Sequence, residues 1–252
     1  MIKFFRKIRQ QMLADKKITN YFLYAVGEIL LVVVGILIAL QINNKNESRK
    51  LVQKEIEILQ LLQESLAKDL VKFQKVSSFY KVSEKSIKRV LNHLENNLPY
   101  EDTLATDFFN TTIYYVQSSF TNGPFETLKS SGLELISNTN LRLKIVDVYD
   151  DWDITMEAGE NRYIELIMDA GLNKHDLRFD EFLHGTFKND VVLGVMNPTD
   201  YKSLKEDKKY IYSLKTQLNL MGWLVEKPIH EATLHGNRLK DLIKNELEQL
   251  DK

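Results

Sequence analysis

The stretch that decides the fold is YFLYAVGEILLVVVGILIALQI, residues Tyr21 to Ile42. Fourteen residues from Phe22 to Ile42 are Leu, Ile, Val or Phe, and at about −0.3 to −0.6 kcal/mol each they favour membrane insertion by roughly 6 kcal/mol. Glu28 opposes insertion by at most about 3 kcal/mol. A helix of about 20 residues, rising about 1.5 Å per residue, also matches a hydrocarbon core of about 30 Å. The sequence therefore predicts one membrane-spanning helix over residues 21–42.

Two other kinds of segment share part of this pattern. A buried core helix of a soluble protein seldom runs this long without a polar stripe. A cleaved signal peptide has a shorter apolar region and a small-residue cleavage site, which Leu40-Gln41-Ile42 does not offer. The membrane span is favoured over both.

The Lys and Arg residues that flank the span predict its direction. Six lie in residues 1–20, and four lie in residues 43–54. The positive-inside rule then puts the N-terminus in the cytoplasm, the span in the bacterial inner membrane and residues 43–252 in the periplasm. Residues 1–20 interleave apolar and basic residues, which is typical of an amphipathic segment on an anionic leaflet, although a basic flank that only sets topology would share most of these residues.

One face of the predicted span carries an acid and two small residues. At about 100° per residue, Glu28, Gly35 and Ala39 fall on one stripe. The spacing Gly35-x-x-x-Ala39 lets two helices approach closely, and a protonated Glu28 could hydrogen-bond across such a contact. The alternative is that Glu28 reaches the lipid headgroups by itself. Self-association through this face, which would make the protein a homo-oligomer, is one hypothesis, and the headgroup contact of Glu28 is the other.

The composition excludes several functions. Residues 1–42 hold six basic and two acidic side chains, which leaves 28 basic and 33 acidic side chains for residues 43–252. A mildly acidic outer domain argues against nucleic acid as a partner. The chain has no Cys, so disulfides, thiolate nucleophiles and thiolate metal sites are absent. Four Pro and ten Gly among 252 residues leave little room for flexible linkers and favour helix.

Two segments of the N-terminal region carry a resemblance to a known group of proteins. They are FFRKIRQ, residues 4–10, and YAVGEILLVVVGILIALQINNKNE, residues 24–47. They resemble the amino-terminal anchor of an uncharacterised, domain-of-unknown-function family of small bacterial single-span membrane proteins. The resemblance is close over residues 1–50 and loose beyond. It implies a single-span envelope protein with a helical outer region, and it assigns no catalytic residue.

The outer region reads as a helical bundle. Residues 43–98 contain neither Gly nor Pro, and their apolar residues recur in steps of three and four, as in a helix with one buried face. This stripe comprises Val52, Ile56, Leu59, Leu62, Leu66, Leu70, Phe73, Val76, Tyr80, Ile87, Val90, Leu91 and Leu94. It is wider than a strict heptad, so a bundle core is favoured over a coiled coil. The predicted fold is all-α, with the membrane helix continuing into a long helix of an extracytoplasmic bundle.

Further helices are expected after Pro99. Their ranges are 102–118, 124–131 ending at Gly132, 138–170 ending at Gly171, and 201–224, with an interruption near Lys227-Pro228 before a last helix. Asn138 or Thr139 is expected to cap the third of these helices. Val191 to Met196 could form a short strand, but the sequence offers no obvious pairing partner.

We looked for catalytic and metal-binding patterns. Six acids crowd one predicted helix, and without a DxDxDG loop they indicate a solvated acidic face rather than a calcium site; they are Asp147, Asp150, Asp151, Asp153, Glu157 and Glu160. The five histidines do not form HExxH, and no GxSxG, P-loop or GxGxxG occurs. Lys129-Ser130-Ser131-Gly132 has the composition of a serine–lysine dyad but lacks the order and spacing of SxxK. We expect no catalytic residue, no cofactor and no metal, and hence no enzyme.

An aromatic group around the Asn122-Gly123-Pro124 turn is the candidate binding site. Its members are Phe108, Tyr114, Tyr115, Phe120, Asn122 and Phe125. Tyr and Phe beside a loop can line a pocket for a small molecule or peptide, or they can seal one end of a bundle. Two functions follow as hypotheses. The first is association, as a scaffold or accessory subunit of an envelope complex, with lipid and a protein as partners. The alternative is a sensory module with an aromatic-lined ligand pocket.

Overall fold

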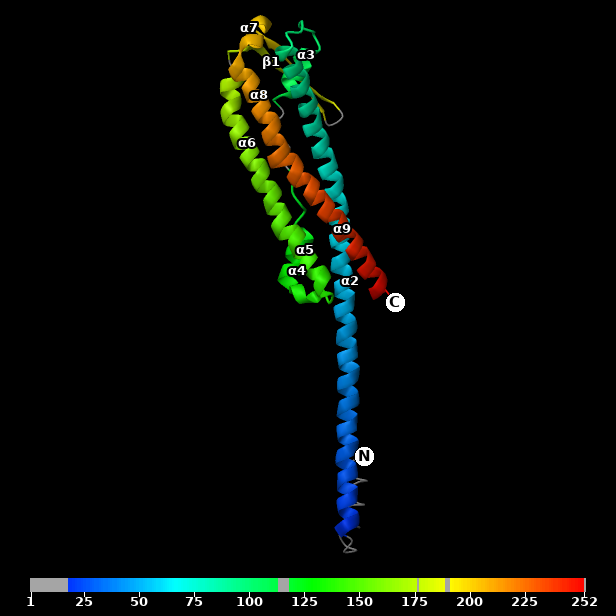
Figure 1. Cartoon of the computed structure of the whole chain (residues 1–252). Coiled ribbons are helices and arrows are strands. Elements are labelled where there is room, and N and C mark those ends of the chain that lie inside the picture. Colours follow the sequence, from blue (N-terminus) through cyan, green and yellow to red (C-terminus); the bar gives the residue numbers. More distant parts are fainter. Residues whose placement is uncertain (1–17, 113–117, 176, 189–190, 252) are drawn as a thin grey trace. The chain divides into compact units, whose positions relative to one another are not determined.

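The computed structural model describes residues 18–112, 118–175, 177–188 and 191–251 (Figure 1). The described chain is helical apart from one short hairpin, which confirms the predicted all-α class. Its longest element, α2 (Ile18–Glu95), begins in the apolar N-terminal region and continues into the region predicted to form a bundle. The chain divides into two compact units, Met1–Lys54 and Glu55–Lys252, which are described separately below.

The first unit contains the apolar part of α2. The large apolar side chains from Phe22 to Ile42 are between 42% and 73% exposed, because nothing in the described chain covers them. An 18-residue window of this helix has a mean hydropathy of 2.5 and is 0% buried. Among the described residues, one helix, near the N-terminus, is therefore long and apolar enough to cross a membrane.

The second unit is built on the rest of α2. From Leu59 onward, the predicted apolar stripe forms the wall of a hydrophobic core, with Leu59, Leu62, Phe73 and Tyr80 fully buried. This burial explains why apolar residues recur every three or four positions, since only one face of the helix contacts its neighbours. The prediction of a bundle core is confirmed along this part of the helix.

The other helical elements follow in order along the second unit. They are α3 (Leu104–Asn110), α4 (Gly123–Ser131), η1 (Leu133–Leu135), α5 (Thr139–Val146), η2 (Asp147–Trp152), α6 (Asp153–His175), α7 (Tyr201–Glu206), α8 (Lys208–Met221), η3 (Gly222–Glu226) and α9 (Lys227–Leu250). The helix α6 packs against α8 and α9 (Figure 1). Where α9 meets α2, a β-carbon on Gly236 would lie 3.1 Å from Leu70 Cδ2, so the two helices are in close contact.

Local signals explain several helix ends. The side chain of Asn138 accepts hydrogen bonds from the backbone N–H groups of Asn140 and Leu141, and so caps α5 as predicted. The end of α4 at Gly132 is also confirmed, and Gly132 has φ of 96°, a left-handed conformation that favours glycine. Asp200 and Asp207 cap α7 and α8 in the same way as Asn138 caps α5.

Other helix limits differ from the prediction. The helix α3 ends at Asn110, and Ser118, the expected end, lies outside any helix. The helix α6 continues through Gly171 to His175, since a single glycine costs a helix only about 1 kcal/mol. The expected interruption at Pro228 is a π-helical segment, η3, and Pro228 stands in the first turn of α9, where its missing N–H is tolerated.

The short hairpin supplies the partner that the sequence did not reveal. Strand β1 (Phe179–Lys188) pairs antiparallel with β2 (Val191–Pro198). The pairing is irregular between Phe179 and Glu181 and between His184 and Phe187, so β1 lacks the strict alternation that identifies a strand. The hairpin lies on α3, because a β-carbon on Gly194 would lie 2.2 Å from Phe109 Cε2.

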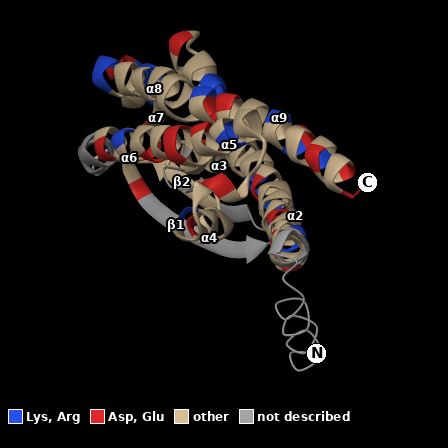
Figure 2. Ribbon diagram, turned by 90° about the horizontal axis from the view of Figure 1, so that it is seen from below, with Lys and Arg blue, Asp and Glu red and all other residues tan. Residues whose placement is uncertain are grey.

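Figure 2 shows Lys and Arg interspersed with Asp and Glu along the helices. Many of these charges form exposed pairs one helical turn apart, such as Lys68 with Glu64 at 2.8 Å. Pairs of this kind contribute only about 0.3–0.5 kcal/mol each. These pairs therefore add little to the stability of the fold, which rests on the core.

Candidate functional site

The described members of the predicted aromatic group are mostly core residues. Phe120 and Phe125 are both buried and both pack on Tyr149, with ring centroids at 5.5 Å and 5.0 Å. Phe108 is also buried and packs on Phe179 of β1, at 5.1 Å. The structure thus brings Phe120 and Phe125 together around one ring and gives Phe108 a different neighbour.

Of the other three members of that group, the structure describes one, Asn122. Asn122 is exposed and precedes α4 without a side-chain capping bond. Tyr114 and Tyr115 lie outside the described residues. A ligand pocket built on this group stays a prediction.

The residues of the predicted membrane contact face lie on α2 in the first unit. Gly35 and Ala39 are exposed, and Glu28 is half-buried. A β-carbon on Gly35 would meet nothing within 4 Å. The surface over Gly35 is open, and self-association through Glu28, Gly35 and Ala39 stays a prediction.

Three buried carboxylates bind loops rather than lining a cleft. Glu55 Oε1 accepts hydrogen bonds from the N–H and hydroxyl of Ser137, at 2.7 Å and 3.0 Å. Asp69 accepts from the N–H and hydroxyl of Thr121, at 2.7 Å and 2.6 Å. Both acids are 2% exposed. Each carboxylate therefore satisfies the two donors of one Ser or Thr just before a helix begins, α5 after Ser137 and α4 after Thr121.

Glu160 is the third of these carboxylates. Its burial shows that the prediction of a solvated acidic face was wrong for this residue. It is 2% exposed and accepts from the N–H of Ser118 at 3.1 Å and 2.9 Å, and from the Ser118 hydroxyl. Burial raises the pKa of the Glu160 carboxyl, while the bonds from Ser118 and the charge of Lys72 lower it. A buried acid with a raised pKa is often catalytic, but here its contacts hold the loop before α4.

The described histidines that have contacts are also structural. His93 Nδ1 lies 3.3 Å from the carbonyl oxygen of Pro99, where the chain turns after α2. The ring of His235 packs on Trp152 with centroids 4.5 Å apart and lies 4.0 Å from Asp147. Within the described ranges, no group of three His, Cys, Asp or Glu residues could hold a metal ion.

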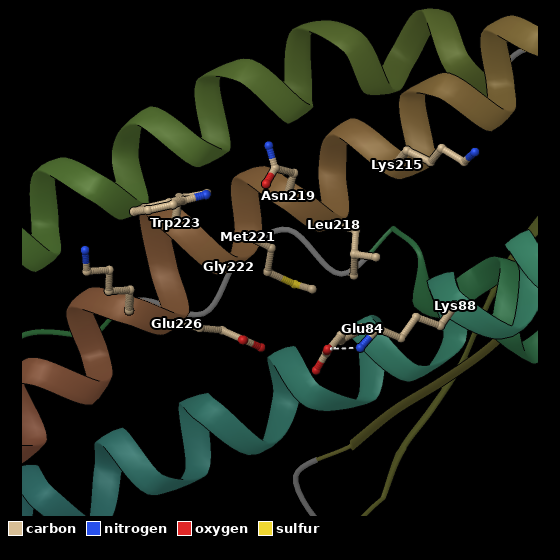
Figure 3. A pocket seen from close by; sticks show the side chains of 10 residues that line it. Glu84, Lys88, Lys215, Leu218, Asn219, Met221, Gly222, Trp223 and Glu226 are labelled. Atoms are coloured by element: carbon tan, nitrogen blue, oxygen red, sulfur yellow. Dashed lines mark hydrogen bonds and ion pairs between the residues drawn. The ribbon is translucent and has the colours of Figure 1, made fainter.

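A pocket of about 460 Å³ lies between α2, α8 and η3, and its size is typical of a small-molecule site (Figure 3). Its lining residues come from α2, α8, η3 and the start of α9; they are Glu84, Lys88, Lys215, Leu218, Asn219, Met221, Gly222, Trp223, Glu226 and Lys227. The π-helical turn of η3, closed by a bond from the Lys227 N–H to the Gly222 carbonyl, contributes Trp223 and Glu226 to the lining. Such turns are frequent at functional sites.

The apolar part of the lining is formed mainly by three side chains. Met221 is 1% exposed and Leu218 is half-buried, whereas Trp223 is 62% exposed. The pocket therefore offers an apolar floor and an accessible indole ring, which suit the carbon skeleton of a small ligand.

The lysines of the pocket all have partners. Lys88 forms an ion pair with Glu84 one turn away, and Lys215 Nζ lies 2.5 Å from Glu95. The Lys227 ammonium lies 4.8 Å from the centre of the Trp223 ring, a cation–π contact.

Glu226 differs from these residues because one of its oxygens has no donor. Its Oε1 is buried and receives no hydrogen bond from the described chain. Burial raises the pKa of the Glu226 carboxyl, and the charge of Glu84 raises it further, while Lys81 and Lys88 lower it. In Figure 3, the carboxylates of Glu226 and Glu84 point into the space between η3 and α2. This arrangement can accept a hydrogen bond from a bound molecule.

Sequence reasoning missed this pocket because its two walls are distant in the chain. Glu84 and Lys88 belong to α2, whereas the remaining lining residues lie between Lys215 and Lys227. The one available signal was the helix interruption near Lys227-Pro228, since a proline that disturbs a helix often marks a local irregularity.

Comparison with known proteins identifies a family but no activity. A family model described as a family of unknown function (DUF6090) matches residues 28–211, which is more than half of the chain. Neither a curated protein nor a solved structure matches the chain. The earlier resemblance to an uncharacterised family is therefore confirmed, and the chain belongs to the family of unknown function DUF6090.

Proposed function

We propose that this protein is a single-pass protein of the bacterial inner membrane, with a periplasmic helical domain that works by association as a scaffold or accessory subunit of an envelope complex. The observation that carries the proposal is the apolar run of α2, whose hydropathy window is 0% buried. So much exposed apolar surface requires a lipid or protein environment. The excess of Lys and Arg before the run supports a cytoplasmic N-terminus.

The contacts of the buried acids support association rather than catalysis. Glu55, Asp69 and Glu160 would be the first candidates for acid–base chemistry because they are buried carboxylates. Each instead accepts both donors of a loop Ser or Thr. In this proposal the domain carries out no reaction of its own, and its rigid loops present a surface to a partner.

Crosslinking in native membranes tests this function. A lysine-reactive crosslinker is suitable because many lysines of the second unit are exposed, for example Lys68 and Lys244. The proposal expects either a dimer of this chain or a reproducible product with one other envelope protein, identified by mass spectrometry. Recovery of neither product, under conditions that crosslink a known envelope complex, would contradict it.

A second function, binding of a small molecule, is supported by the pocket beside η3. Its volume of about 460 Å³ and its mixed apolar and charged lining are typical of ligand sites. Thermal shift of the purified full-length chain with a panel of envelope metabolites tests this function. A ligand that raises the melting temperature in proportion to the logarithm of its concentration supports the function, and a panel without effect counts against it.

A further inference from the structure

We propose that the pocket beside η3 binds a protonated organic amine, whose ammonium group is held by the carboxylate of Glu226. The inference rests on the second function above and names its ligand class. It follows from three features of the pocket, which are a missing donor, the carboxylate charge of Glu226 and an apolar wall.

The missing donor is the first feature. The three lysines of the pocket already have partners. Lys88 pairs with Glu84 and Lys215 pairs with Glu95, while the ammonium group of Lys227 lies over the ring of Trp223. Glu226 Oε1 is buried and lacks a hydrogen-bond donor in the described chain. A buried acceptor is normally satisfied, so the group that this pocket lacks is an N–H or O–H donor.

The charge at that oxygen favours a cationic donor over a neutral one. Glu226 and Glu84 direct their carboxylates into the same space, and of the two Glu84 is already paired with Lys88 (Figure 3). Burial is the main cause that raises the pKa of Glu226, the charge of Glu84 adds to it, and Lys81 and Lys88 oppose it only partly. An ammonium group bonded to Glu226 would stabilise its ionised carboxylate, whereas a carboxylate or phosphate there would be repelled.

The lining indicates an organic amine rather than a metal ion. Two carboxylates supply fewer oxygen ligands than Ca²⁺ usually takes, and the described residues hold no group of three His, Cys, Asp or Glu that could bind a metal ion. Beside them lie the buried Met221, the half-buried Leu218 and the exposed ring of Trp223. These side chains would contact a hydrocarbon or aromatic skeleton attached to the ammonium group.

Calorimetric titration of the full-length chain in neutral detergent with three matched probes tests the inference. The probes are phenethylamine, 2-phenylethanol and 3-phenylpropanoate, which share a ring and differ in the terminal charge. We expect phenethylamine to bind, the alcohol to bind at least about tenfold more weakly, and the acid to show no binding, because a charge-assisted hydrogen bond is about twice as strong as a neutral one.

The variant Glu226→Gln keeps the shape of the side chain and removes its charge. We expect it to weaken phenethylamine binding about tenfold or more. Its matched control is Glu248→Gln, an exposed residue of α9 outside the pocket lining that makes the same charge change. The control should bind phenethylamine like the unmodified chain, and circular dichroism should show that both variants are folded.

The outcomes separate the ligand class from the binding function. Equal or tighter binding of the alcohol or the acid, or an unchanged affinity in Glu226→Gln, would overturn the amine assignment and leave small-molecule binding intact. No binding of any probe would overturn both. Nanodiscs of choline lipid and of ethanolamine lipid distinguish the source of the amine. Equal phenethylamine affinities in the two support a soluble amine, and a lower apparent affinity in ethanolamine lipid supports a lipid headgroup at Glu226.

Discussion

The backbone of α6 touches the backbone of η3 where Gly159 faces Leu224. A β-carbon on Gly159 would lie 2.3 Å from the Leu224 carbonyl oxygen and 3.7 Å from Pro228 Cγ. Pro228 has no N–H, so it cannot bond the carbonyl four residues before it, which is that of Leu224. The proline, the π-helical turn and the glycine thus form one packing unit next to the pocket.

Replacing Gly159 with Ala should disrupt this contact. The added methyl group cannot fit against a carbonyl at 2.3 Å, so α6 and η3 must separate. We expect a loss of about 2 kcal/mol in the free energy of unfolding, measured by urea denaturation of the full-length chain in detergent. Gly123→Ala is the control, because a β-carbon there meets nothing within 4 Å. A Gly159→Ala variant as stable as this control would contradict the close packing.

The bond between Thr121 and Asp69 gives a second prediction. Thr121→Val removes the hydroxyl that donates to Asp69 Oδ1 at 2.6 Å and leaves a buried carboxylate with one donor fewer. We expect a loss of about 1–3 kcal/mol in the free energy of unfolding. Thr127→Val is the control, because the same change there removes only an exposed hydrogen bond to the Gly123 carbonyl oxygen, at 3.0 Å. Calorimetry should show a clearly lower melting temperature for the first variant only.

Glu160 makes the stability of the fold depend on pH. Burial raises its pKa in the folded state above the ordinary value of 4.5, against the opposing effects of Ser118 and Lys72 and with a small contribution from Glu157. The folded state therefore binds this proton more tightly than the unfolded state does. The resulting stability is fully present below pH 4.5 and is lost as pH rises through the raised pKa.

The variant Glu160→Gln should lack this pH dependence. Relative to the variant, the unmodified chain should lose free energy of unfolding as the pH rises above 4.5. Urea denaturation of both proteins at a series of pH values measures the difference between them. A difference that stays constant, or changes in the opposite direction, would show that Glu160 is not held at a raised pKa.

Much of the fold was predictable because its signals are local. The spacing of Leu59, Leu62 and Phe73 predicted the buried face of α2. Asn138 and Gly132 predicted a helix start and a helix end through hydrogen-bond and φ preferences that act within a few residues.

The missed features depend on contacts between distant residues. The irregular pairing of β1 removed the alternation by which a strand is recognised. The burial of Glu160 depends on Ser118, 42 residues earlier in the chain, and no spacing within the acidic helix reveals which loop will cover it. The site beside η3 combines Glu84 and Glu226 from two helices, so neither segment alone carries a motif.

The membrane contact face can be tested directly because the chain has no Cys. A single cysteine at Ala39 lies on the predicted face with Gly35, and one at Leu37 lies on the opposite side of the helix at about 100° per residue. We expect oxidation of native membranes to give a disulfide-linked dimer with Ala39→Cys and little with Leu37→Cys. Equal dimer yields from both positions would argue against a specific face.

Alkaline phosphatase fusions test the proposed membrane topology, in which the N-terminus is cytoplasmic and residues 43–252 are periplasmic. The enzyme is active only in the periplasm, so fusions after Asn44 and after Lys252, expressed in a Gram-negative host, report the location of the helical domain. We expect activity at both positions, because the excess of Lys and Arg before residue 21 favours a cytoplasmic N-terminus. Inactive fusions at both positions, with the fusion proteins present in the membrane, would contradict it.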